Sequence, residues 1–226
     1  VELTLLRKAA LSFYPSEEEC KAIHAIDSTI RVKPLTAYVW DSFPELGDFG
    51  YEKREGLLFV GGFAHPPNLD AVLWFLKEVF PKIRAEEPVN FYVAGSKVPE
   101  ELKALHSPEN GIHILGFVSD ERLRELYENC RLVVVPLRYG AGVKGKVIEA
   151  LYYGAPVLTT SIGAEGIPAA ETVMEIEDSA PRFAEAALCL YRDRAALEGL
   201  SARASTYIRA HNGMDAVWEA LKSDFS

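Results

Sequence analysis

The sequence lacks an excess of basic charge and lacks any long apolar run. Its 24 Lys and Arg residues are outnumbered by 33 Asp and Glu residues, which gives a net charge of −9 over 226 residues. An acidic balance of this kind argues against a general nucleic-acid-binding surface. No apolar run approaches the roughly 20 residues that a membrane-spanning helix needs. We therefore expect neither nucleic acid as a partner nor a transmembrane segment.

Cysteine is also scarce. The three cysteines, Cys20, Cys130 and Cys189, are widely spaced and form no CxxC pair. Such spacing suits neither a disulfide framework nor a zinc site, and an odd number is typical of a reducing compartment. We expect three free, buried thiols, no metal site and a cytoplasmic protein.

What the sequence does contain is an ordinary globular composition, 49% hydrophobic, in which strand-like and helix-like segments alternate. From residue 57 to 176 each apolar run of strand length is followed by a segment with helical periodicity, and residues 181–222 then become helical. This order predicts an α/β fold, a Rossmann-like doubly wound parallel sheet. The predicted strands are residues 57–62, 89–94, 112–117, 132–137, 157–160 and 172–176.

Residues 132–160 contain the most informative pattern. A buried strand ends in the loop 139–146, which has three glycines and two lysines, and a helix follows that should stop at Gly154, two residues before Pro156. Small residues let a backbone approach an anion, free N–H groups at the helix start face it, and lysines neutralise it. The pattern predicts a binding site for a phosphorylated small molecule.

Other loops at the same edge of the sheet should complete this site, because ligands of parallel sheets lie beyond the carboxyl ends of the strands. These loops, residues 62–65, 95–97, 117–119, 138–146 and 161–166, are rich in glycine. They carry the basic residues Lys97, Arg138, Lys144 and Lys146 on an otherwise acidic chain.

Two familiar nucleotide motifs fit poorly. Residues 140–146 match GxxxxGK of the P-loop, but the Ser or Thr that would bind magnesium is replaced by Val147. A P-loop-like kinase or nucleotidase is thereby disfavoured and stays an alternative. The dinucleotide fingerprint GxGxxG is absent after the first strand, at residues 61–67, which disfavours an NAD enzyme.

Several ordered motifs between residues 56 and 167 resemble a known family. The run resembles the C-terminal, donor-binding domain of GT-B glycosyltransferases of the family 4 (group 1) type, and covers about half of the chain. The matching motifs are Phe59-Val60-Gly61-Gly62 with Pro67-Asn68, Val93-Ala94-Gly95, Leu115-Gly116-Phe117-Val118, Lys146-Val147-Ile148-Glu149-Ala150, Gly154-Ala155-Pro156-Val157 and Gly163-Ala164-Glu165-Gly166-Ile167.

The resemblance implies roles for particular residues, with no metal and no further cofactor, and a UDP- or GDP-linked sugar as the donor. Glu149 would accept hydrogen bonds from the ribose hydroxyls, as a carboxylate can from two vicinal hydroxyls. The catalytic residues stay unassigned. The donor diphosphate would contact Gly62, Arg138, Gly142, Lys144, Gly145 and Lys146, and the base and sugar would be lined by His65, Phe117, Val118, Ser161, Gly163 and Glu165.

Two departures from the family pattern affect this interpretation. The first glutamate of the Glu-x7-Glu pattern falls on Ala141, so one usual sugar contact is missing. The loop after the first strand has Phe63, Ala64 and His65 where basic residues are usual, and Lys144 would substitute for them. The identity of the donor therefore stays open.

The resemblance also predicts a division of the chain. Residues 1–50 would be the end of an acceptor-side N-terminal domain plus a linker, 51–180 the donor-binding domain, and 181–226 helices that pack back toward the N-terminal domain. Because the sequence begins at Val1, inside a helix-like segment, we expect a fragment of a longer protein. The linker would cover residues 38–53, with Pro44, Gly47 and Gly50.

The expected activity is transfer of a glycosyl group, with retention, from a nucleotide sugar to a sugar, lipid-linked or polymer acceptor. The acceptor would be held mostly by the missing N-terminal domain, so the isolated fragment should be inactive. By analogy, a lipid-linked acceptor would place the protein at the inner membrane face. A non-catalytic nucleotide-sugar-binding module and a sugar-nucleotide epimerase of GT-B architecture stay open as alternatives.

Each selected residue also has a structural explanation. Glu149 could pair with Lys146 on the helix surface, Lys144 and Lys146 could be ordinary surface lysines, and His65 could simply precede a helix. Trp74 and Trp218 are expected in the core, and the other histidines, His24, His106, His113 and His211, are expected to be structural or exposed.

Overall fold

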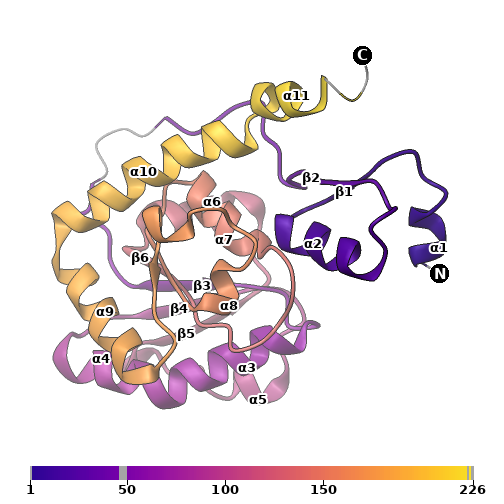
Figure 1. Ribbon diagram of the computed structural model, residues 1–226. Helices are drawn as coiled ribbons and strands as arrows, with labels where there is room; N and C mark the ends of the chain where they lie inside the picture. The colour runs from indigo at the N-terminus through magenta and orange to yellow at the C-terminus, as the bar shows by residue number, and fades with distance from the viewer. Residues whose placement is uncertain (1, 46–49, 223, 225–226) are drawn as a thin grey trace.

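The computed structural model describes residues 2–45, 50–222 and 224, and its main feature is a six-stranded parallel sheet (Figure 1). The strand order is β5-β4-β3-β6-β7-β8. The chain therefore moves outward from β3 in one direction and from β6 in the other, which makes the β3/β6 junction the switch point of a doubly wound sheet. The strands are β3 (Leu57–Val60), β4 (Phe91–Ala94), β5 (Ile112–Gly116), β6 (Leu132–Val135), β7 (Val157–Thr159) and β8 (Glu175–Ile176). The predicted fold class is confirmed.

Helices cover both faces of this sheet. Figure 1 shows α3 and α4 on one side of the strands and α6 and α7 on the other. The covering helices are α3 (Pro66–Trp74), α4 (Phe80–Glu86), α5 (Glu100–Lys103), α6 (Asp120–Asn129), α7 (Gly145–Tyr152), α8 (Ser161–Ala164) and α9 (Ala180–Arg192), with short 3-10 turns at Pro108–Asn110 and Ala170–Thr172. No helix in the described part of the chain is long and apolar enough to cross a membrane.

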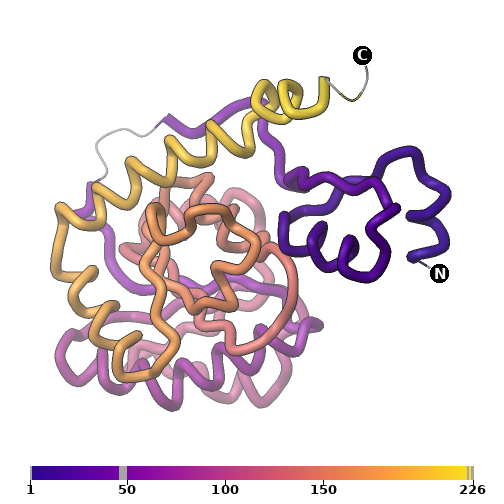
Figure 2. Tube along the Cα trace, viewed as in Figure 1, coloured from indigo at the N-terminus to yellow at the C-terminus, as the bar shows by residue number. Residues whose placement is uncertain are grey.

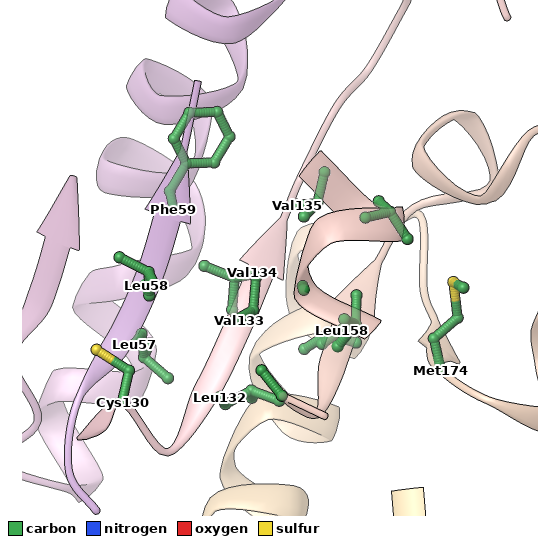
Figure 3. Close-up of a cluster of buried hydrophobic side chains, with 14 of the residues drawn as sticks. Leu57, Leu58, Phe59, Cys130, Leu132, Val133, Val134, Val135, Leu158 and Met174 are labelled. Carbon is green, nitrogen blue, oxygen red and sulfur yellow. The ribbon is translucent and has the colours of Figure 1, made fainter. Parts of the chain in front are cut away.

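The central strands are buried on both faces, as their continuous apolar sequences predict. Leu57, Leu58 and Phe59 of β3 and Leu132 of β6 have no exposed surface. Figure 3 shows their side chains together with Val133 to Val135, Leu158 and Met174. This core fixes the carboxyl ends of β3 and β6 beside each other.

One irregularity interrupts the predicted helix after β3. A π-helical segment, Phe75–Val79, separates α3 from α4. Pro81, in the first turn of α4, has no N–H to donate to the preceding turn, so the hydrogen-bonding register widens before it. Trp74 still packs edge-on against Phe183 of α9, with ring centroids 6.1 Å apart, and its predicted place against the core is confirmed.

The N-terminal segment lies beside the sheet domain, as Figure 2 shows in indigo. It contains α1 (Glu2–Leu6), β1 (Ser12–Tyr14), α2 (Glu17–Ile26) and β2 (Val32–Pro34), and β1 pairs in parallel with β2. This segment buries a small cluster of its own, separate from the main core, because α2 packs one apolar face against β2; the cluster is Leu6, Cys20, Ile23, Ile30 and Val32.

The chain crosses between these two parts twice, and the crossings are bonded to each other. On the outward crossing, the N–H of Trp40 donates to the carbonyl of Asn212, and the side chain of Asn212 donates to the carbonyl of Tyr38 (2.8 Å). The return crossing follows α10 (Arg194–Asn212) and leads into α11 (Met214–Lys222). Of the predicted linker 38–53, Gly47 lies outside the described residues.

Three expectations about single elements were wrong. The strand predicted at 172–176 is shorter, since Thr172 belongs to a 3-10 turn. Trp218 is 61% exposed, because α11 buries none of its residues in the core. Cys189 is exposed on the outer side of α9, whereas Cys20 and Cys130 are buried as predicted.

Candidate functional site

The candidate site begins at the glycine loop between β6 and α7. Lys144 is the N-cap residue of α7 and adopts an extended conformation, but no side chain of the described chain caps this helix start. Ser16, Ser119, Thr160 and Asp193 cap α2, α6, α8 and α10, whereas α3, α5 and α9 start without a side-chain cap, as α7 does. The N–H groups that open α7 thus lack a side-chain partner and can donate hydrogen bonds to an anion.

The far end of α7 is closed as the sequence predicts. Gly154 adopts a left-handed conformation (φ 64°), and its N–H donates to the carbonyl of Leu151. The N–H of Ala155 donates to the carbonyl of Ala150. These two bonds form a Schellman stop, which keeps the helix at two turns and fixes its N-terminus beside the end of β6.

Lys146 joins the two halves of the sheet at the switch point. Its ammonium donates to Oδ1 of Asn68 on α3 and lies 5.0 Å from the centroid of the Phe59 ring. Asn68 is held in turn by donating to the carbonyl of Gly62 (2.7 Å). Burial, with a smaller effect from Lys144, lowers the pKa of Lys146 to about 8. A buried ammonium with a neutral partner is poised to bind an anion.

Lys144 has a different environment. Its ammonium donates to the carbonyls of Gly140 (3.3 Å) and Gly142, and it forms an ion pair with Glu165 (2.9 Å). An ammonium has three N–H donors, so these three acceptors engage all of them. Lys144 therefore holds the shape of the glycine loop, and it must release an acceptor before it can bind a phosphate.

Arg138 is also paired. Its guanidinium contacts the carboxylate of Asp70 on α3 through two hydrogen bonds, one of them from Nε at 2.9 Å. This pair is the second link between the segments that follow β3 and β6. Arg138 is about half exposed, so its charge lies at the rim of the site, partly neutralised by Asp70.

Glu149 does not pair with Lys146, so the alternative of a Glu149–Lys146 pair on the helix surface is wrong. Its Oε2 accepts a hydrogen bond of 3.0 Å from the hydroxyl of Tyr127 on α6. Burial raises the pKa of the Glu149 carboxyl, and the Tyr127 hydrogen bond opposes that rise. Glu149 is thus a half-buried, oriented carboxylate one turn inside α7 and not a freely solvated one.

The structure distributes the remaining predicted residues over the same edge of the sheet. Gly62 and His65 follow β3, and Phe117 and Val118 follow β5, where Phe117 is 80% exposed. Ser161 begins α8 and hydrogen-bonds to Asp178 through its N–H (2.8 Å) and hydroxyl (2.9 Å). Gly163 is buried against Thr159, so its lack of a side chain has a packing reason.

Four residues in contact with this site were missed by sequence reasoning. Asn68 and Asp70 orient Lys146 and Arg138, Tyr127 contacts Glu149, and the hydroxyl of Tyr38 lies against Gly145. Asn68 lies within a motif already noted, and its polarity at a buried helical position was a usable signal. Tyr38 and Tyr127 are distant in sequence and gave none.

The position that would bind magnesium in a P-loop is occupied by Val147, whose side chain is fully buried. It therefore faces the core and not the ligand. Among the described residues, no group of three or more His, Cys, Asp or Glu side chains is arranged to hold a metal ion.

Comparison with known structures gives the same fold. TarM from S. aureus superposes with a TM-score of 0.80 at 14% identity, over 100% of this chain and 45% of TarM. Anabaena HepE, crystallised with UDP and glucose, gives 0.73 at 15% identity, over 99% of this chain and 65% of HepE. The chain has the C-terminal half of a GT-B fold and a partial segment of the N-terminal domain.

Sequence comparison gives the family. The model for glycosyl transferases group 1 matches residues 54–193, more than half of the chain. The chain therefore belongs to the group 1 glycosyltransferases, as the motifs predicted. An uncharacterized 44.6 kDa protein in the cps region of Klebsiella pneumoniae is 35% identical over 133 residues, 54% of this chain and 34% of that protein.

A second relative is an uncharacterized glycosyltransferase of Methanocaldococcus jannaschii. It is 29% identical over 112 residues, which are 47% of this chain and 27% of the relative. The two matches thus span only 34% and 27% of the length of these curated relatives.

Proposed function

We propose that this chain binds the nucleotide-diphosphate sugar of a group 1 glycosyltransferase. The observation that carries the proposal is the open N-terminus of α7, placed at the β3/β6 switch point next to the buried ammonium of Lys146. A diphosphate there would meet backbone N–H groups, the positive end of the helix dipole and a cation with a neutral partner.

The same groups would assist the chemistry. Transfer of the glycosyl group breaks the bond between the sugar and the diphosphate, and negative charge grows on the leaving phosphate. Lys146 and the start of α7 would stabilise that charge, and a preorganised, partly buried cation does so more effectively than one in water. Lys144 would contribute after giving up one of its present acceptors.

The remaining contacts are those that the family resemblance implies. Glu149 would bind the ribose hydroxyls, since it lies one helical turn from Lys146 with an oriented carboxylate. Phe117 and Val118 would contact the base and Ser161 to Glu165 the sugar. UDP in the crystal structures of HepE and of pneumococcal GtfA supports a UDP-linked donor, with GDP as the alternative.

The activity of the whole protein is part of this proposal. Retention at the transferred carbon, and an acceptor that is a sugar, a lipid-linked sugar or a polymer, are features that the family resemblance implies. Residues that hold the acceptor would lie on an N-terminal domain of which this chain has a segment. The 226-residue chain would therefore bind donor and transfer little or no sugar. Detectable transfer by the isolated chain at a normal enzymatic rate contradicts that point.

Calorimetric titration tests the proposal. The chain is titrated with UDP, GDP, ATP and the corresponding nucleotide sugars, with and without magnesium. Magnesium-independent binding of one nucleoside diphosphate is expected, weakened about tenfold or more in Lys146→Ala, as for a lost charged hydrogen bond. Lys103→Ala is the matched control, because Lys103 is an exposed lysine paired with Glu100 on α5. Binding of ATP alone, and only with magnesium, contradicts the proposal and favours a P-loop-like enzyme.

A further inference from the structure

The buried hydroxyl of Tyr127 contacts the carboxylate of Glu149, the one acidic residue of α7. Tyr127 has no exposed surface, and its hydroxyl donates to Oε2 of Glu149 at 3.0 Å. The two residues come from different helices, α6 and α7, and are 22 positions apart. This contact is therefore tertiary and depends on how the two helices pack.

The ring of Tyr127 is held firmly. It stacks on Tyr153, just past the end of α7, with ring centroids 4.9 Å apart and ring planes inclined by 16°. Tyr153 in turn meets Tyr152 edge-on at 5.0 Å. Stacked and edge-to-face aromatic contacts of this kind favour a single ring orientation, so the hydroxyl direction is set before any ligand arrives.

The hydrogen bond leaves part of the carboxylate available. A carboxylate has two oxygens that together accept about four hydrogen bonds, and Tyr127 takes one of them on Oε2. Among the described residues, no protein donor contacts Oε1 of Glu149. Oε1 and the remaining lone pairs of Oε2 are free to accept from two hydroxyl groups.

We infer that Tyr127 is a positioning residue that orients Glu149 and thereby sets the preference of the site for a ribose with both hydroxyls. The inference rests on the proposed function, in which Glu149 contacts the ribose. Without Tyr127 the Glu149 side chain gains rotational freedom and its charge loses a hydrogen-bond donor in a desolvated place. Both effects weaken recognition of the ribose hydroxyls while leaving the diphosphate contacts unchanged.

The test compares a nucleoside diphosphate with its 2′,3′-dideoxy form. The 226-residue chain is titrated with UDP and 2′,3′-dideoxy-UDP, and with the GDP pair, by calorimetry. Wild type should prefer the ribo form by about tenfold or more. In Tyr127→Phe this preference should fall by about five- to tenfold through loss of affinity for the ribo form, with the dideoxy affinity nearly unchanged.

A second readout separates orientation from simple damage to the fold. In Tyr127→Phe the pKa of Glu149 should rise further, because the hydrogen bond that lowers it is gone. As the pH is lowered, both proteins should lose their preference for the ribo form when Glu149 becomes protonated. The variant should lose it at a higher pH than wild type. A purely structural change would lower stability and leave both the preference and its pH profile as they are.

Tyr191→Phe is the matched control. The hydroxyl of Tyr191, on α9, also takes part in one hydrogen bond, which it accepts from the N–H of Gly56 (2.8 Å). Gly56 directly precedes β3, so this contact lies at the opposite end of that strand from the glycine loop. This variant should lose stability without any change in the preference. An unchanged preference and pH profile in Tyr127→Phe overturn the inference alone. Failure of wild type to bind either diphosphate, or to prefer the ribo form, overturns the proposed function of the site or of Glu149.

Discussion

Lys146 on α7 hydrogen-bonds to the side chain of Asn68 on α3, so the helices that follow β3 and β6 are tied together where the two halves of the sheet meet. The bond puts a buried cation at the point where ligands of doubly wound sheets bind. The burial of this ammonium disfavours its charged form, because desolvation opposes the charge.

The pKa of Lys146 therefore predicts how diphosphate binding depends on pH. In the folded chain this pKa is about 8, below the ordinary value of 10.5. Between these values the unfolded state binds more protons, so the unligated chain gains stability as pH rises from about 8 toward 10.5. A bound diphosphate should raise the pKa of Lys146 again, so binding near pH 8.5 takes up a proton and weakens as pH rises further.

Calorimetry of diphosphate binding in buffers of different ionisation enthalpy measures this uptake directly. Lys146→Met should abolish the uptake together with most of the affinity. Lys82→Met is the control, since Lys82 is an exposed lysine on α4 whose ammonium contacts the carbonyl of Glu78. Binding without proton uptake in wild type would show that Lys146 does not meet the diphosphate.

We expect Glu165 to compete with a bound diphosphate for Lys144. The ion pair between them is 2.9 Å long and only partly shielded, since the Glu165 side chain is 39% exposed. Removing the charge in Glu165→Gln should free Lys144 and tighten nucleoside diphosphate binding by about two- to fivefold, the range of a partly exposed pair. If Glu165 also contacts the sugar, Glu165→Gln should reduce the extra affinity that a nucleotide sugar has over the nucleoside diphosphate. Weaker diphosphate binding in Glu165→Gln would contradict the competition.

Glycine is required at position 145 by the close approach of Tyr38 and not by its own backbone conformation. A Cβ there would lie 2.5 Å from the hydroxyl oxygen of Tyr38, so Gly145→Ala must displace the linker tyrosine or the start of α7. We expect diphosphate affinity to fall by about tenfold for a displacement costing about 1.4 kcal/mol. The double variant Gly145→Ala with Tyr38→Ala should recover most of that loss, and an equally weak double variant would argue against this cause.

Gly95 tests the packing of the loops behind the site. A Cβ on Gly95 would overlap the carbonyl oxygen of Gly61, which is backbone and cannot swing away. Gly95→Ala should therefore destabilise the chain by roughly 2–4 kcal/mol in urea denaturation. Gly62→Ala is the control, because its Cβ would come no closer than 3.4 Å to Ser96. Similar stabilities for the two variants would contradict the packing seen at Gly95.

Much of the fold could be predicted because the sequence states it locally. The apolar runs of β3 and β6, the stop at Gly154 and the glycine loop each depend on neighbours in sequence, and the structure confirms them. The π-helical segment before Pro81 and the exposed Trp218 were missed. Helical periodicity alone does not reveal hydrogen-bonding register or whether a partner covers the face of a terminal helix.

The site could be predicted as a set of loops but not as a set of pairs. Lys144 and Lys146 have similar positions in sequence, yet one is saturated by Gly140, Gly142 and Glu165 and the other contacts neutral Asn68. These partners lie as far as 78 positions away. Periodicity and motif spacing carry no information about such contacts. The different environments of Lys144 and Lys146 could therefore not be predicted from the sequence.

The most direct test of the central claim is a crystal structure of the chain grown with UDP or GDP. The account predicts the diphosphate against residues 142–146, with Lys146 in contact with a phosphate oxygen and the ribose hydroxyls at Glu149. Ordered nucleotide bound elsewhere, with Lys146 still on Asn68 and no ligand at the start of α7, would contradict it.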